Sequence, residues 1–164
     1  MTGTGGLVIR EMVVPDDVES VMALYRESAK WHAQSWPDRF TAQPGSDNRQ
    51  ELADQLANWQ TDGFILVADA DGAVVGVVSA ELIDGLGGVS EVDGPAVWVG
   101  DVVVTATARR NGVGELLMLA VEEWARQRGA RHIGLQVYVR NGPARSLYGK
   151  LGYVDDHIRM RRDL

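Results

Sequence analysis

The segment VVVTATARRNGVG, residues 102–114, contains the junction that decides the fold. Its first half is a valine run that ends at Val104 and is typical of a buried β-strand. From Val113 onward, apolar residues recur at helical spacing, at positions 113, 116, 117, 120, 121 and 124. The segment is therefore predicted to form a strand, a tight turn and an amphipathic helix.

The turn has the composition of an anion site. Gly112 and Gly114 permit a close approach to the backbone, and the first N–H groups of a helix have no helical acceptors. Arg109 and Arg110 add positive charge, while Asn111 tolerates turn conformations. These features favour a pyrophosphate bound by backbone amides at the positive end of the helix dipole. An ordinary strand-to-helix turn with solvated arginines is the alternative.

The composition restricts the class of protein. With 164 residues, 45% of them hydrophobic, the chain is expected to fold as one domain over residues 1–164. No apolar run approaches about 18 residues and no secretory signal pattern is present, so we expect no membrane association and a cytoplasmic location. A net charge of −7 opposes nucleic-acid binding. The absence of cysteine and the scattered histidines predict that no metal is bound.

The hydrophobic pattern and the turn residues predict a mixed α/β (α+β) fold, with hairpins early and a strand–helix–strand unit late. The predicted elements are a strand at 7–12, a helix starting near Pro15, a helix around 52–59, two strands within 64–82 about a hairpin turn at Asp71-Gly72, a mobile loop at 84–96, a strand at 97–105, a helix from Val113 to Gly129, a strand at 132–139, a helix from Pro143 to Gly152 and a strand at 153–162.

Two motifs resemble the signatures of the GNAT acetyltransferase superfamily. After a hydrophobic strand, Arg109, Gly112 and Gly114 occupy the three defining positions of Gln/Arg-x-x-Gly-x-Gly/Ala. The segment NGPARSLYGKLGY, residues 141–153, is similar to the second signature, Asn-x-x-Ala-x-x-Leu-Tyr-x-Lys-x-Gly-Phe/Tyr. The element order agrees with the family from residue 7 to about residue 160. The resemblance implies a mostly antiparallel central sheet flanked by helices, and acetyl-CoA as the cosubstrate.

The resemblance also implies where acetyl-CoA binds. The backbone of Val102, Val103 and Val104 would pair with the pantetheine arm as if it were an added strand. Asn141 would form a hydrogen bond to the same arm. The backbone amides that would surround the pyrophosphate belong to Arg109, Arg110, Asn111, Gly112, Val113, Gly114 and Glu115.

The charged side chains near these motifs raise two further expectations. Arg140, Arg145 and Lys150 would hold the 3′-phosphate end, unless each is a plain surface cation. Glu115 departs from the family pattern, because a carboxylate that faces a phosphate is unfavourable. We therefore expect the Glu115 side chain to point away from the cofactor.

Acetyl transfer to an amine needs a group that removes the ammonium proton and a group that protonates the departing thiolate. The resemblance makes Asp101 the first candidate for the base. Glu81 on the preceding strand is the second candidate, and Glu91 or Asp93 in the glycine-rich loop is the third. It assigns Tyr148 as the acid near the sulfur atom. Asp101 is alternatively a structural acid at a strand bulge, and Tyr148 alternatively packs against the sulfur and orients it.

The segment AKWHAQSWPDRF, residues 29–40, holds two tryptophans, a histidine and a phenylalanine. In the family this region covers the acceptor pocket, and aromatic faces attract organic cations. Core packing or contacts in a homodimer are the alternative roles of these rings. The residues expected to contact the acceptor are Trp31, His32, Trp36, Phe40 and Glu81.

These features predict an N-acetyltransferase that moves the acetyl group of acetyl-CoA to a primary amine of a small molecule, by direct attack in a ternary complex. Acetylation of a peptide or protein, at its N-terminus or a lysine, is the nearest alternative. A non-catalytic acyl-CoA-binding regulator is a second one, because it would keep the glycine turn without needing Asp101 or Tyr148.

Overall fold

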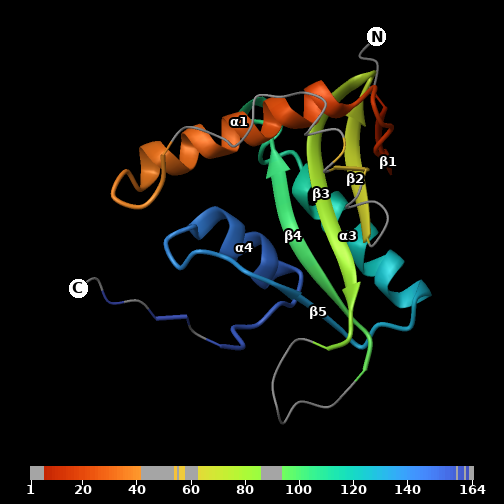
Figure 1. The fold of residues 1–164 in the computed structure, drawn as a ribbon, viewed down its shortest axis with the longest axis vertical. Coiled ribbons are helices and arrows are strands. Elements are labelled where there is room, and N and C mark those ends of the chain that lie inside the picture. Colours follow the sequence, from red (N-terminus) through yellow and green to blue (C-terminus); the bar gives the residue numbers. More distant parts are fainter. Residues whose placement is uncertain are drawn as a thin grey trace.

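The computed structural model describes residues 6–41, 54, 56–57, 63–85, 94–157, 159–160 and 162. Its elements, shown in Figure 1, are β1 (Leu7–Glu11), α1 (Val18–Ser35), β2 (Gly63–Ala70), β3 (Ala73–Ile83), β4 (Ala96–Val104), a short 3₁₀ turn (Ala106–Ala108), α3 (Val113–Gln127), β5 (His132–Leu135) and α4 (Gly142–Lys150). No helix in these ranges is long and apolar enough to cross a membrane.

The strands form one five-stranded sheet in the order β1-β2-β3-β4-β5. Successive strands from β1 to β4 pair antiparallel, whereas β4 and β5 pair in parallel. This confirms the predicted mixed fold with a mostly antiparallel sheet. The β2–β3 hairpin also forms at the predicted turn, where Asp71 and Gly72 have φ values of 52° and 87°.

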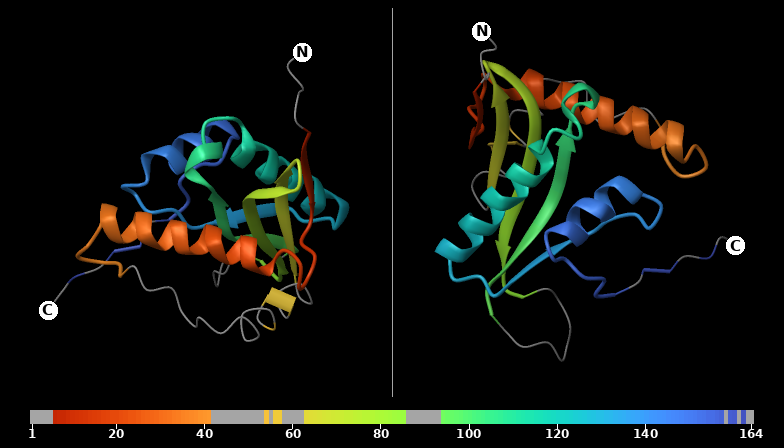
Figure 2. Two further views of the ribbon diagram at one scale, coloured as in Figure 1. Left: turned by 90° about the horizontal axis from the view of Figure 1, so that it is seen from above. Right: turned by 180° about the vertical axis from the view of Figure 1, so that it is seen from behind.

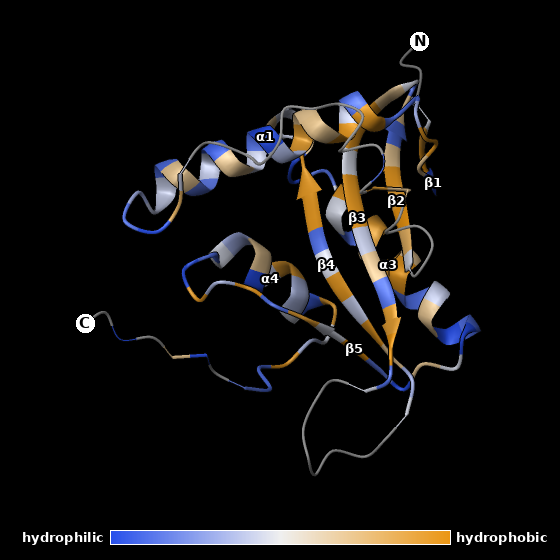
Figure 3. Ribbon diagram, in the orientation of Figure 1, coloured by the Kyte–Doolittle hydropathy of each residue, from blue (hydrophilic) through white to orange (hydrophobic). Residues whose placement is uncertain are grey.

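Helices cover both faces of the sheet, with α1 on one face and α3 on the other (Figures 1 and 2). Successive strand residues alternate between these layers, so Val77 packs beneath α1 and Val78 beneath α3. The strands are largely apolar while α1 carries a polar outer surface, as the hydropathy colours of Figure 3 show. The sheet is therefore buried on both sides, which explains the nearly continuous apolar run of β4.

The first helix begins later than Pro15, because Asp17 is held by β1. The Asp17 carboxylate accepts hydrogen bonds from the Arg10 guanidinium at 2.6 and 3.0 Å and from the Val13 amide at 2.8 Å. Arg10 lowers the pKa of Asp17, and helix α1 starts at Val18. The link fixes the N-terminal end of α1 on the sheet.

Two predicted strands are wrong or too long. The predicted strand at 132–139 ends at Leu135, because its pairing with β4 stops at Val99–Leu135 and the rest has no partner strand among the described residues. No described residue within 153–162 is in a strand. Alternating apolar residues predicted both strands, but a strand also needs a neighbour with which to pair. The predicted helix around 52–59 and the loop at 84–96 lie mostly outside the described residues, although 54, 56 and 57 are helical.

Candidate active site

The sheet splits between β4 and β5. Their pairing begins at Ala96–His132 and stops at Val99–Leu135, yet β4 continues to Val104. On the β5 side, the second half of β4 therefore has no strand partner in the described part of the chain. A cleft of about 2390 Å³ opens there, which is larger than the roughly 1,000 Å³ upper range of pockets for one small ligand.

A β-bulge at Gly100 sets which side chains of β4 enter the cleft. The register with β3 shifts between Ser79–Asp101 and Ala80–Val99, which leaves Gly100 as the extra residue. Val99 packs on the α3 side, whereas Val103, also at an odd position, packs on the α1 side. The bulge thus reverses the alternation and turns Asp101 toward α1. The Asp101 amide donates to the Ser79 hydroxyl at 3.1 Å, which holds the bulge in place.

Asp101 lines the cleft, and no described residue forms a hydrogen bond to its carboxylate. Burial raises the pKa of this carboxyl group, and the nearby charge of His32 partly opposes that rise. A desolvated carboxylate with free oxygen atoms can accept a proton from a bound ligand. The role of Asp101 as the base therefore stays a prediction, and its place in the bulge is the structural role that was the alternative.

Tyr148 on α4 lines the same cleft. Burial, with a smaller contribution from the negative charge of Asp101, raises the pKa of Tyr148 to about 12. The phenol is therefore a weaker acid than free tyrosine and stays protonated across the physiological range. Protonation of Asp101 would remove the second contribution and make the Tyr148 phenol more acidic.

The turn after β4 presents free amides. Gly112 has a φ of 80° and Arg110 a φ of 64°, and the first helical hydrogen bond of α3 runs from the Leu116 amide to the Gly112 carbonyl. In the described chain, the amides of Val113 and Glu115 have no hydrogen-bond acceptor. Positive φ values beside a helix N-terminus create a concave set of N–H donors that suits a phosphate. The turn lies outside the residues that line the cleft but follows directly from the unpaired edge of β4.

Arg109 supports this turn through its side chain. Its Nε atom donates to the Val104 carbonyl at 2.9 Å, and its Nη2 atom lies 3.3 Å from Glu27 of α1. The Glu27 carboxylate also accepts from the Thr105 hydroxyl and from the Ala106 amide, each at 2.7 Å. The guanidinium group of Arg109 therefore holds the turn against α1, which leaves the backbone of Arg109 as the part that can contact a ligand. Sequence reasoning missed Glu27, because no motif marks an acid that is 79 residues from its partner.

Two cations of α4 that were expected to hold the 3′-phosphate end, Arg145 and Lys150, are paired with carboxylates of the chain. Lys150 lies 2.6 Å from the Glu115 carboxylate, and Arg145 lies 2.7 Å from Asp155. Lys150 thus neutralises Glu115, which removes the unfavourable charge beside the amide turn. Asn141 caps α4, since its side-chain oxygen accepts from the Ala144 amide at 3.3 Å.

Four of the five residues expected to contact the acceptor form an aromatic cluster together with Tyr138, and we define this cluster as Trp31, His32, Trp36, Phe40 and Tyr138. His32 contacts the four other rings, with centroid distances from 5.0 to 6.2 Å. Trp36, His32 and Tyr138 line the cleft. Tyr138 comes from the loop after β5 and was missed, because its segment was predicted to be a strand. The cluster joins the end of α1 to the opposite side of the split sheet.

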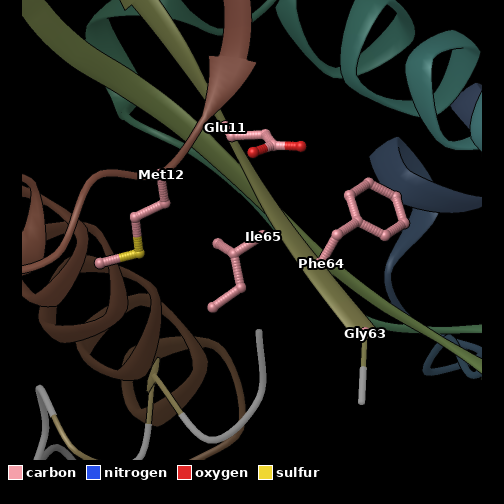
Figure 4. A pocket seen from close by; sticks show the side chains of 5 residues that line it. All are labelled: Glu11, Met12, Gly63, Phe64 and Ile65. Carbon is pink, nitrogen blue, oxygen red and sulfur yellow. The ribbon is translucent and has the colours of Figure 1, made fainter. Parts of the chain in front are cut away.

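Other expected acids do not join this arrangement. Glu81 is exposed on β3 and does not line the cleft, while Glu91 and Asp93 lie outside the described residues. A second hollow of about 300 Å³ lies on the β1–β2 side, where Glu11 is the titratable group among its lining residues. Figure 4 shows Met12 and Ile65 of this hollow on the side of α1 and Phe64 directed away from it.

The amino-acid sequence of the chain identifies its family. The sequence model described as the acetyltransferase (GNAT) family matches residues 23–153. The chain belongs to the GNAT acetyltransferase family. Among curated relatives, the mycothiol acetyltransferase of Saccharomonospora viridis is 31% identical over 153 residues, which are 90% of this chain and 46% of that protein. The chain thus spans less than half the length of that relative.

Solved structures share the fold of this GNAT chain. A mutant of the BH1408 protein from Bacillus halodurans has a TM-score of 0.83 at 23% identity, covering 96% of this chain and 99% of that one. Aminoglycoside N-acetyltransferase AAC(6')-Iy, solved in complex with CoA, has a TM-score of 0.73 at 19% identity, with 99% and 98% covered. At these identities the likeness establishes the architecture.

Proposed function

We propose that this GNAT protein transfers the acetyl group of acetyl-CoA to a primary amine of a small molecule, by direct attack in a ternary complex. One arrangement carries the proposal: an unpaired strand edge leads into free helix-terminal amides, and an unpaired carboxylate and a phenol line the adjoining cleft of the described chain. The neighbour solved with CoA and the aminoglycoside and mycothiol acetyltransferases support this cosubstrate and acceptor class.

The residues present fit acetyl-CoA. The backbone of Val102, Val103 and Val104 offers the hydrogen-bonding groups of a sheet edge to an extended pantetheine arm, apart from the Val104 carbonyl, which accepts from Arg109. The amides at Val113 and Glu115 offer donors to a pyrophosphate. Acetyl-CoA supplies the thioester, whose carbonyl carbon is the electrophile.

Asp101 and Tyr148, which both line the cleft, then carry out different proton transfers. Asp101 accepts a proton from the acceptor's ammonium group, directly or through one water, because only the neutral amine is a nucleophile. The nitrogen lone pair forms the new C–N bond, the C–S bond breaks and Tyr148 donates its proton to the thiolate. The second proton that the nitrogen loses as it becomes an amide restores the Tyr148 phenol. A backbone N–H of β4 polarises the carbonyl as an oxyanion-hole donor. Juxtaposition of the amine and the thioester supplies much of the acceleration.

The test is the release of free thiol from acetyl-CoA across a panel of amines, with mass spectrometry of the acetylated products. Thiol release that depends on a small amine supports the proposal. Release with peptides alone would favour a peptide or protein acetyltransferase. Binding of acetyl-CoA without release with any acceptor would favour a non-catalytic regulator. Gel filtration with light scattering tests the homodimer that the family resemblance suggests.

A further inference from the structure

The hydrogen bond of His32 to its own helix fixes the state of its imidazole ring. The Nδ1 atom lies 2.8 Å from the Ser28 carbonyl oxygen, with the Ser28 hydroxyl at 3.4 Å. A carbonyl oxygen can only accept, so Nδ1 carries the proton. In the neutral ring the lone pair is therefore on Nε2.

The surroundings of the ring leave Nε2 for a ligand. The other four members of the aromatic cluster pack around His32, and the residue lines the cleft together with Asp101 and Tyr148. Among the described residues, no partner forms a hydrogen bond to Nε2. A ring that is held by its helix and its neighbours, with one free nitrogen, is prepared to accept a proton from a substrate.

We propose that His32 is a further catalytic residue, whose Nε2 atom takes the proton from the acceptor's ammonium group beside the Asp101 carboxylate. This inference rests on the proposed function and revises one step of it: His32 rather than Asp101 takes the proton, and the Asp101 carboxylate stays ionised beside it. The N–H bond breaks toward Nε2 and its electron pair stays on the amine, which then attacks the thioester carbon. The imidazolium ion that forms is stabilised by the negative charge of Asp101.

Ordinary acidities explain why a carboxylate benefits from an imidazole beside it. An alkyl ammonium group has a pKa near ~10, an imidazole near ~6.5 and a carboxyl group near ~4. In free solution, proton transfer to an imidazole is therefore less uphill than transfer to a carboxylate, and the burial that raises the pKa of Asp101 narrows this difference. Among the described residues, the negative charge of Asp101 on β4 interacts with His32, and the Tyr138 ring after β5 lies 6.2 Å from it, with Arg39 4.9 Å over that Tyr138 ring.

Two substitutions separate proton transfer from structural support. His32→Asn keeps a donor for the Ser28 carbonyl, and His32→Phe keeps a ring in the aromatic cluster. Neither can accept a proton, so both should lower kcat/KM at neutral pH by about 100-fold. The matched control is His132→Asn, which removes an exposed imidazole that also lines the cleft but lies at the start of β5, at the opposite end of the β4–β5 pairing from the bulge.

The decisive readout compares two acceptors, the most active primary alkylamine of the panel and the hydrazide of the corresponding acid. A hydrazide is neutral at pH 7 and needs no base before attack. The loss in both variants should be large with the alkylamine, small with the hydrazide, and should diminish as the pH approaches ~10. An equal loss with both acceptors at every pH, or wild-type activity in either variant, would overturn the role of His32 as a base and leave the proposed function standing. No thiol release by the wild-type protein with any amine would overturn the proposed function and this inference with it.

Discussion

The Glu27 carboxylate of α1 accepts hydrogen bonds at 2.7 Å from both the Ala106 amide and the Thr105 hydroxyl, so one side chain ties α1 to the turn between β4 and α3. The same carboxylate pairs with Arg109, whose backbone belongs to the proposed pyrophosphate site. The conformation of the amide turn therefore depends on a helix that is remote in sequence.

Glu27→Gln should weaken the binding of acetyl-CoA by about 10-fold. A hydrogen bond to a charged group contributes about 1.5–3 kcal/mol, and loss of the Glu27 charge weakens the hydrogen bonds that hold the amide turn. Isothermal titration calorimetry with acetyl-CoA measures the effect. The control is Glu19→Gln, an exposed position on α1 that pairs with Arg26. Equal affinities in the two variants would show that Glu27 does not organise the site.

Asp101→Asn should lower turnover and raise the melting temperature at neutral pH. Burial raises the pKa of Asp101 in the folded state, so above the unfolded pKa of ~3.9 its charge opposes folding, and stability falls as the pH rises through the folded value. Asn removes that penalty, and the gain in stability should vanish in acid. A melting temperature that is unchanged or lower at pH 7 would contradict this assignment.

Asp17→Asn should have the opposite effect on stability. The Arg10 guanidinium lowers the pKa of Asp17, so its charge stabilises the fold above pH ~4, and that stability is lost as the pH falls through the folded pKa. Thermal melts between pH ~3 and pH ~8 should show a destabilised variant at neutral pH that approaches the wild type in acid. A constant difference across this range would argue against the ion pair.

Tyr148→Phe should reduce kcat by about 10²-fold, the effect of one general acid, while the affinity for acetyl-CoA changes little. Pre-steady-state thiol release and calorimetry measure the two quantities. Tyr153→Phe is the control, since its ring lies 5.9 Å from that of Tyr148 and its buried hydroxyl has no hydrogen bond among the described residues. Unchanged turnover in Tyr148→Phe would leave this residue a packing role.

Gly100→Ala should lower activity by moving Asp101. A Cβ atom at residue 100 would lie 2.9 Å from the Ser79 hydroxyl oxygen, which accepts the Asp101 amide, so that hydrogen bond must be disturbed. Ser79→Ala removes the same hydroxyl without adding an atom, and its comparison with Gly100→Ala separates the two effects. Full activity in both variants would show that the bulge does not position the carboxylate.

The sequence could predict the elements that depend on turn residues and on the spacing of apolar residues. The hairpin at Asp71-Gly72, helix α3 and the capped helix α4 all follow from turn residues and periodicity, and the structure confirms them. The bulge at Gly100 could not be predicted, because it depends on the pairing of β4 with β3. Without the bulge, Asp101 would lie on the face covered by α3.

Long-range contacts account for the rest of the difference. Nothing in the local sequence links Glu27 to Ala106 or Tyr138 to His32, since each pair meets only when α1 crosses the sheet. The strand predicted beyond Leu135 failed for a related reason. Its alternating pattern is real, but the split of the sheet leaves it without a partner in the described chain.

Every proposed role depends on the binding of the CoA pyrophosphate by the amides between Arg109 and Glu115, which calorimetry of the intact protein with acetyl-CoA measures directly. Saturable binding is expected for the wild-type protein, and a bulky Gly112→Val substitution should abolish it because this position has a φ of 80°. Absence of binding to the wild-type protein at millimolar acetyl-CoA, or unchanged binding to Gly112→Val, would contradict this role of the amides.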